Sequence, residues 1–174
     1  PEEPMGERIK TDHVPYDQFA AGGWLTPTPG AGIDYATIEN TILDIRKQYN
    51  VIELAADPSF ATYLLQRLET AGVTYAAIAQ TVAVLTDPMN MVETLLRDGK
   101  LTHDNNPLAR WAFGNTSIWQ NGNGQKKFVK ETRGHNIVRT KRIDPIAALV
   151  IGMARAKLYE TGGSVYEGRG LITI

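Results

Sequence analysis

Hydrophobic positions in the first half of the chain follow two alternating periods. Residues 34–49 repeat apolar side chains at helical spacing after Asp34, a favoured N-cap residue, which predicts an amphipathic helix. The short apolar run 51–57 is typical of a buried strand, 58–71 again shows helical spacing, and 73–78 is a second strand-like run. This order is typical of a parallel α/β unit, so we expect the two strands to be neighbours in one sheet with helices packed on it.

The second half of the chain also mixes helical and strand-like patterns. Residues 86–88 predict the start of a helix that ends at Gly99, and a short helix is expected over 106–111. Strand-like runs flank the sequence Asn-Gly-Asn-Gly at 121–124, which predicts a β-hairpin, and a long helix is expected over 144–160. The stripe expected to face the core from the first of these helices is Met89, Val92, Leu95 and Leu96.

The two ends of the chain lack such patterns. Residues 1–13 are charged and aperiodic, which predicts a connecting arm, and residues 161–174 form a Gly-rich tail of the same single domain, 1–174. Next to the arm, 14–19 indicates a short helix closed by glycines, and 24–26 a brief strand. Because the sequence begins without Met, we expect it to be a piece of a longer protein.

Composition narrows the class of protein. The 174 residues are 43% hydrophobic and 21% charged, as expected for one globular domain with a sizeable core. The net charge of -1 gives no overall cationic excess, so nucleic-acid binding requires a local patch. No apolar run reaches the ~18 residues of a membrane span, and the first residues are not a signal sequence. We therefore expect a soluble intracellular domain.

Several chemistries have no support in the sequence. The chain has no Cys, which excludes disulfides and thiolate metal sites, and its 3 His residues show no helical ligand spacing. It also has no phosphate-binding loop, nucleophile elbow or strand-linked dinucleotide fingerprint, so ATP binding, serine hydrolysis and dinucleotide binding are not indicated.

Two carboxylates stand at positions that favour a ligand site. Asp57 closes the predicted strand 51–57, and Asp144 lies in the first turn of the last helix. Each also precedes Pro and fits a helix N-cap, which is an alternative for both. If the two converge, a divalent cation could neutralise their repulsion, so they are candidate catalytic Mg²⁺ or Mn²⁺ ligands. Glu53 shares a strand face with Asp57 and is a reserve ligand.

Positive charge is concentrated just before Asp144. The basic strip, as we call it, has one anion, Glu131, and seven cations: Lys126, Lys127, Lys130, Arg133, Arg139, Lys141 and Arg142. Such a strip is either a solvated charged face or a surface that neutralises DNA phosphates. Because it lies on a predicted hairpin and loop with no recognition helix, we expect contacts to the phosphate backbone rather than to base edges.

Five sequence blocks occur in an order that matches a known family. They are 14–17 (Val-Pro-Tyr-Asp), 24–30 (Trp-Leu-Thr-Pro-Thr-Pro-Gly), 33–35 (Ile-Asp-Tyr), 106–111 (Asn-Pro-Leu-Ala-Arg-Trp) with Asn115, and 141–149 (Lys-Arg-Ile-Asp-Pro-Ile-Ala-Ala-Leu). In order and rough spacing they resemble the C-terminal nuclease domain of the large terminase subunit of tailed bacteriophages. Family members usually carry Gly where this chain has Pro145, a change that a helix start tolerates.

The resemblance implies a fold and an activity. The fold is a ribonuclease H-like α/β domain, with a central sheet flanked by helices and its first strands missing from this chain. The activity is that of a metal-dependent endonuclease, which cuts concatemeric viral DNA for genome packaging with two Mg²⁺ or Mn²⁺ ions. The family's acids fall on Asp144 and Asp57, and a further family Asp lies upstream of Pro1.

The same resemblance implies partners and location. They are double-stranded viral DNA, the portal and the small terminase subunit, in the host bacterial cytoplasm and away from any membrane. The alternative is a non-catalytic DNA-binding or packaging-assembly module, because the block that carries the upstream Asp, and the family's ATPase motor domain, are absent from this sequence.

Overall fold

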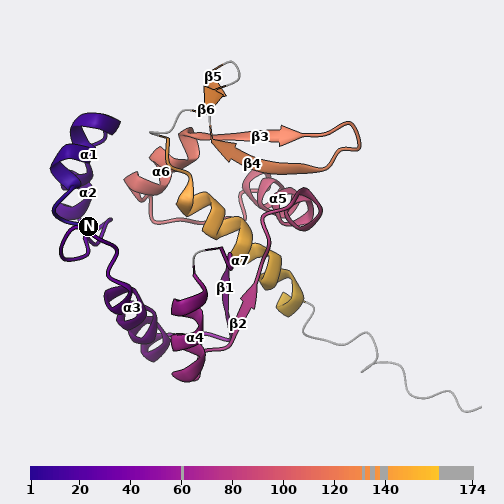
Figure 1. Ribbon diagram of the computed structural model, residues 1–174. Coiled ribbons are helices and arrows are strands. Elements are labelled where there is room, and N and C mark those ends of the chain that lie inside the picture. Colours follow the sequence, from indigo (N-terminus) through magenta and orange to yellow (C-terminus); the bar gives the residue numbers. More distant parts are fainter. Residues whose placement is uncertain (60, 131, 134–135, 138–140, 161–174) are drawn as a thin grey trace, which may run out of the picture.

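The computed structural model of the chain describes residues 1–59, 61–130, 132–133, 136–137 and 141–160, and these form a mixed α/β structure (Figure 1). Their helices are α1 Met5–Asp12, α2 Tyr16–Ala21, α3 Tyr35–Gln48, α4 Thr62–Thr70, α5 Val82–Arg97, α6 Pro107–Gly114 and α7 Asp144–Glu160. Their strands are β1 Leu54–Ala56, β2 Tyr75–Ala77, β3 Thr116–Gln120, β4 Lys126–Lys130, β5 Thr132–Arg133 and β6 Asn136–Ile137. No helix in this part of the chain combines the length and apolar character needed to span a bilayer. The predicted Gly-rich tail lies outside the described residues.

The parallel strand pair predicted from the first half of the chain is confirmed. β1 and β2 pair in parallel, with Leu54 opposite Tyr75 and Ala56 opposite Ala77. The prediction of one central sheet is not met among the described residues, whose strands form three separate two-stranded sheets. β3 and β4 pair with each other as the predicted antiparallel hairpin, and β4 packs on α5, so this hairpin does not extend the parallel pair.

The main hydrophobic core lies where α5, α6, β4 and α7 meet. Its buried members are Leu85, Met89, Val92, Ala112, Phe128, Ile143, Ile146 and Val150. Helix α7 also contacts β1, so it joins this core to the parallel pair (Figure 1). Of the stripe predicted for α5, Met89 and Val92 are buried, whereas Leu96 is 44% exposed.

Helix α5 begins at Val82, earlier than the predicted start at 86–88, and Thr81 is its N-cap. Pro88 lies inside the helix, where it removes one backbone hydrogen bond, but its ring is buried. The Thr86 hydroxyl is not a cap: it accepts a 3.0 Å hydrogen bond from the first backbone N–H of β4. The Thr-Asp-Pro sequence at 86–88 therefore resembles a helix start, but in the folded chain it lies inside α5.

The N-terminal segment is more ordered than its sequence pattern predicts. Helix α1 forms within residues 1–13, where a connecting arm is predicted, and it packs on α2. Its last residue, Asp12, is buried, and the Asp12 carboxylate accepts hydrogen bonds from the Tyr16 hydroxyl at 2.9 Å and from Arg142 at 3.5 Å. These polar contacts anchor the segment to the loop before α7 and leave no signal in hydrophobic periodicity.

The predicted strand at 24–26 is wrong, although the predicted short helix before it is confirmed as α2. The backbone N–H groups of Trp24 and Leu25 both donate to the Phe19 carbonyl, at 2.8 and 3.2 Å. The segment therefore folds back on the end of α2, and these donors are not available for a strand.

Helix α3 lies within the predicted range 34–49, and its N-cap is the predicted Asp34, whose carboxylate accepts from the Ala36 N–H at 3.0 Å. It packs on α4 rather than on the sheet as predicted, and none of its residues is buried (Figure 1). Ile45 on its apolar stripe is 45% exposed, and Tyr49, which follows the helix, is 65% exposed. Helical periodicity thus predicts the helix correctly but not the surface that covers it.

Candidate active site

Asp57 lies directly after β1, at the carboxyl end of the parallel pair. Its carboxylate accepts a 2.9 Å hydrogen bond from the Ser59 N–H and a second bond from the side-chain amide of Gln80. These donors, the backbone N–H of Ser59 first, hold the pKa of Asp57 below its ordinary value. Because α4 begins only at Thr62, Asp57 caps the turn after β1 rather than the helix.

Asp144 is the first residue of α7, and the contacts of neighbouring residues fix the position of its backbone. Ile143 beside it is buried in the core, and the Ile143 carbonyl accepts from the N–H groups of Ile146 and Ala147 at 3.0 Å. Asn115, 2% exposed, donates from its side chain to the Arg142 carbonyl at 3.1 Å. The Asp144 carboxylate is exposed and makes no hydrogen bond or ion pair with the described residues. The backbone of Asp144 is therefore fixed, while its carboxylate has no partner among the described residues.

The elements that carry these two acids touch each other. β1 contacts α7, and α7 runs past β1 in the opposite sense to the strand (Figure 1). Among the described residues no group of three His, Asp or Glu side chains is arranged to hold a metal ion. A shared site of Asp57 and Asp144 therefore stays a prediction.

Glu53, the reserve ligand, is engaged in an ion pair. The Nη2 atom of Arg155 on α7 donates to its Oε2 at 3.0 Å, and the Nε atom of Arg155 donates to Oε1. The Glu53 side chain is 8% exposed, and the Arg155 guanidinium lowers the pKa of its carboxyl. Metal binding by Glu53 would require this pair to open.

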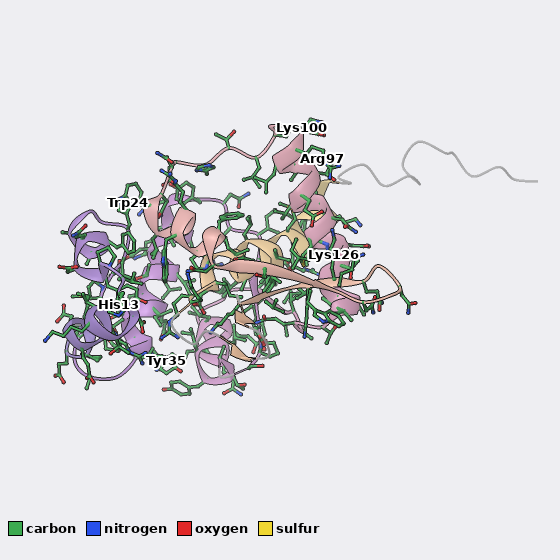
Figure 2. The ribbon with its side chains drawn as sticks, turned by 90° about the horizontal axis from the view of Figure 1, so that it is seen from above. His13, Trp24, Tyr35, Arg97, Lys100 and Lys126 are labelled. Carbon is green, nitrogen blue, oxygen red and sulfur yellow. The ribbon has the colours of Figure 1, made fainter. Side chains whose placement is uncertain are left out.

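Two cations of the basic strip are engaged with acids of the fold. Lys126 Nζ lies 2.7 Å from both carboxylate oxygens of Glu93 on α5, and its side chain is 13% exposed. Figure 2 shows Lys126 along this helix, with Arg97 and Lys100 together near the C-terminal end of the helix. Arg142 pairs with the buried Asp12. The structure thus uses both side chains to join elements.

The remaining cations of the strip are placed differently. Because side chains alternate along a strand and Phe128 faces the core, Lys127 lies on the opposite face of β4, where its ammonium is 5.9 Å from the centre of the Trp119 ring. Lys130 and Lys141 are half-buried. Arg133 lies in β5 without a described side chain, and Arg139 lies outside the described residues.

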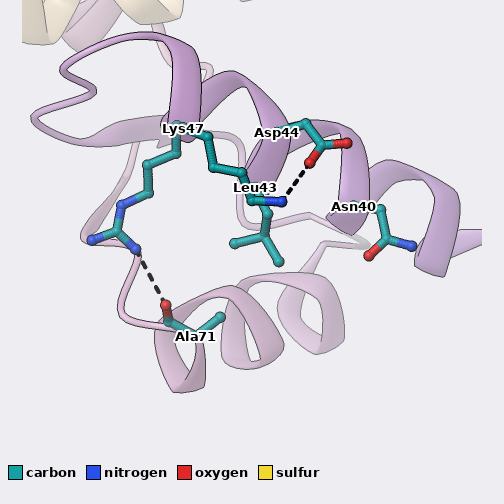
Figure 3. Close-up of a pocket in the computed structure, with 6 residues that line it drawn as sticks. Asn40, Leu43, Asp44, Lys47 and Ala71 are labelled. Carbon is teal, nitrogen blue, oxygen red and sulfur yellow. Dashed lines mark hydrogen bonds and ion pairs between the residues drawn. The ribbon is translucent and has the colours of Figure 1, made fainter.

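Two of the surface hollows in the described part of the chain are candidates for a ligand site. One, of about 570 Å³, has a mainly apolar lining from α5, α6 and α7 that includes Pro145. The other, of about 430 Å³, lies between α3 and α4, where Arg46 donates to the Ala71 carbonyl and Lys47 pairs with Asp44 (Figure 3). Neither lining includes Asp57 or Asp144, so these hollows are not the candidate site.

Three side chains that contact a candidate acid or the segment before Asp144 were not predicted as parts of the site: Gln80, Asn115 and Arg155. Gln80 follows β2, and the rule that parallel strand ends share one edge could have pointed to it. Asn115 appears in the sequence blocks without a role. Arg155 lies eleven residues after Asp144, about three helical turns, so it is on the same helix face. Its partner Glu53, 102 residues away, leaves no local signal.

Comparison with known families decides what kind of domain this is. Residues 1–160 match the family described as terminase large subunit, endonuclease domain. The chain belongs to this terminase nuclease family. Protein YmfN of Escherichia coli K12 is 30% identical over 145 residues, which cover 83% of this chain and 31% of YmfN. The chain spans about a third of the length of such relatives.

Terminases of two phages support the assignment. The large subunit from Enterobacteria phage HK97 is 25% identical over 167 residues, covering 94% of this chain and 32% of that protein. The crystal structure of the HK97 large terminase superposes with a TM-score of 0.76 at 23% identity, over 89% of this chain and 32% of that one. The crystal structure of the large terminase nuclease from thermophilic phage G20c superposes with a TM-score of 0.55 at 14% identity, over 76% of this chain and 64% of that one. The terminase nuclease domain described above therefore shares its fold with both.

Proposed function

We propose that this terminase nuclease domain is a ribonuclease H-like, metal-dependent endonuclease that cuts concatemeric viral DNA for genome packaging. The observation that carries the proposal is the state of Asp144. Core residues and Asn115 hold its backbone, yet its carboxylate is exposed and unpaired within the described structure. A carboxylate held in this way is available to a ligand, whereas a helix-capping Asp has its oxygens occupied.

Asp57 and Asp144 are the proposed catalytic metal ligands. Carboxylate oxygens are the donors that Mg²⁺ and Mn²⁺ favour, and the hydrogen bonds that lower the pKa of Asp57 stabilise the charged form of this carboxyl. When bound, one or two such ions supply an activated water and stabilise the charge that develops on the phosphate. The residues themselves act as follows: Ser59 and Gln80 orient Asp57, and Asn115 with Ile143 fixes the start of α7.

The proposed substrate is double-stranded DNA, held by the basic strip through its phosphates. Within the strip Lys127 is the foremost candidate, because it faces away from the core and lies beside the exposed Trp119. Lys126 and Arg142 already neutralise acids of the fold. On the basis of the family alone, we further propose that the portal and the small terminase subunit are its protein partners and that it acts in the host cytoplasm.

Plasmid cleavage tests the nuclease function. We expect the chain to cleave plasmid DNA with Mn²⁺, and Asp144→Ala and Asp57→Ala to abolish cleavage. Their unfolding midpoints should stay close to that of the wild type, because both side chains lie at least partly in solvent. Asp44→Ala, which removes a carboxylate that is 61% exposed on α3, is the matched control and should cleave normally.

The same assay decides the alternative of a silent assembly module. That alternative is a module that binds DNA but lacks a complete metal site. A folded, full-length nuclease domain that binds DNA but gives no cleavage at any Mn²⁺ concentration would establish the silent module and reject the enzyme.

A salt titration tests the DNA contact. The logarithm of affinity should fall linearly with the logarithm of salt concentration, and Lys127→Ala should reduce the slope by about 0.9 if one duplex phosphate is lost. Lys126→Ala is the control within the strip, and its slope should be unchanged because Glu93 already holds that ammonium. A slope that changes with Lys126 and not with Lys127 would reverse this assignment.

A further inference from the structure

A bidentate ion pair joins the two elements on which the candidate acids lie. Glu53 precedes β1, and Asp57 follows it, four residues further along the chain. Arg155 and Asp144 lie on α7, eleven residues apart. Arg155 donates to both carboxylate oxygens of Glu53. Two parallel N–H···O bonds between a guanidinium and a carboxylate fix direction as well as distance.

Glu53 and Asp57 lie just outside the two ends of the three-residue strand β1, so they are separated by the length of that strand, about 13 Å at 3.3 Å per residue. Residues eleven apart on a helix are separated by about three turns, or about 16 Å along the axis, and also share a face. Since α7 runs past β1 in the opposite sense, moving from the Glu53–Arg155 pair towards Asp57 is also moving towards Asp144 (Figure 1).

We propose that Glu53 and Arg155 are positioning residues, which set the rotation and the axial position of α7 on β1 and thereby the place of Asp144 relative to Asp57. The proposal rests on the proposed metal-dependent function. It assigns Glu53 a role different from that of a metal ligand, because both its oxygens are bound by Arg155 and its side chain is 8% exposed.

The test measures Mn²⁺ binding to the full 174-residue chain without DNA, from the electron paramagnetic resonance signal of free Mn²⁺. Glu53→Gln, Arg155→Gln and the double variant form a cycle, and folding is followed by circular dichroism. Each single variant should weaken Mn²⁺ binding about tenfold or more, the range of substitutions that support metal ligands from outside. The double variant should be no weaker than either single variant, because the two residues act as one unit.

Glu39→Gln is the matched control. It removes an ion pair of the same kind, between Glu39 on α3 and Arg67 on α4, two helices that pack on each other away from the α7–β1 contact. We expect this variant to bind Mn²⁺ like the wild type, even if its unfolding midpoint falls.

Three results would overturn the inference, each in a distinguishable way. Unchanged Mn²⁺ affinity in Glu53→Gln and Arg155→Gln, with only lower unfolding midpoints, would show that the pair serves stability alone. Loss of binding in Glu53→Gln but not in Arg155→Gln would make Glu53 itself a ligand. Wild-type binding that Asp144→Ala does not weaken would reject the proposed metal site, and this inference with it.

Discussion

The two halves of the described structure are stabilised by different means. From Val82 onward, the buried hydrophobic residues of the described chain, apart from Ile151, form one cluster shared by α5, α6, β4 and α7. Before Val82, the buried hydrophobic residues of the described chain are Val14, Leu65, Leu68 and Val73. Helix α3 in this first half buries none of its residues.

This difference separates the two candidate acids. Asp144 follows Ile143, a member of the cluster, so core packing holds it in place. Asp57 lies in the half with few buried residues, and polar contacts from Ser59 and Gln80 hold it instead. Close packing holds a residue within a narrow range of positions, whereas a few hydrogen bonds next to solvent allow more movement. In the proposed shared site, the distance between the two carboxylates therefore varies mainly with the position of Asp57 in the first half.

Truncation of buried and exposed apolar side chains should give the largest contrast. Leu85→Ala, at a residue 1% exposed, should lower the free energy of unfolding by about 2–5 kcal/mol. Ile45→Ala on α3, at a residue 45% exposed, should change it by no more than about 0.5 kcal/mol. Urea unfolding followed by circular dichroism measures both. Equal losses would show that α3 is covered as well as α5, and the contrast between the halves would disappear.

Removal of a buried hydrogen-bond donor should have the next largest effect. Asn115→Ala leaves the Arg142 carbonyl without its donor and should cost about 1–3 kcal/mol of unfolding free energy. Asn90→Ala, at an exposed position on α5, is the control and should stay within about 0.5 kcal/mol. If Asn115→Ala matches this control in urea unfolding, the start of α7 is held by the core alone.

A helix cap in the well-packed half should contribute less. The Asn106 side chain accepts from the N–H groups of Leu108 and Ala109 at 2.9 and 3.1 Å. Asn106→Ala should lower the free energy of unfolding by about 1 kcal/mol, and Asn106→Asp should retain most of the stability, since Asp is an equally good cap. Thermal unfolding of the three proteins in parallel checks the order. An alanine variant as stable as the wild type would show that the N-cap of α6 does not contribute to the stability of the cooperative core.

The smallest effect should be the pH dependence of the N-cap of α3. Hydrogen bonds from the Thr37 hydroxyl and the Ala36 N–H lower the pKa of Asp34 in the folded helix. The cap's contribution is therefore complete above the ordinary value of 3.8 and is lost as the pH falls through the lowered folded-state value. Amide exchange in α3, corrected for intrinsic rates, should accelerate over this window while α6, whose N-cap Asn106 carries no titratable group, stays protected. Asp34→Asn should remove the dependence, and an unchanged profile in that variant would assign it to another group.

Local sequence signals determined many of the elements of this domain. Asp34 begins α3, Asn106 begins α6, the Asn-Gly-Asn-Gly turn joins β3 to β4, and the alternation of helix and strand predicts the parallel pair β1–β2. Each signal acts within a few residues, through a cap, a turn or a hydrophobic period, so it can be read from the chain alone. The positions of Asp57 after a strand and of Asp144 at a helix start were predictable for the same reason.

Tertiary structure decided which surfaces and side chains meet. α5 continues through Pro88, whose ring is buried, and α3 packs on α4 rather than on the sheet. Lys126 pairs with Glu93, Arg142 with Asp12, and Arg155 with Glu53 across 102 residues. The composition and the periodicity of a sequence are the same whether a charged side chain faces solvent, DNA or a buried partner. Only the folded chain brings the partner near, and this is why the basic strip is one feature in the sequence and several separate contacts in the structure.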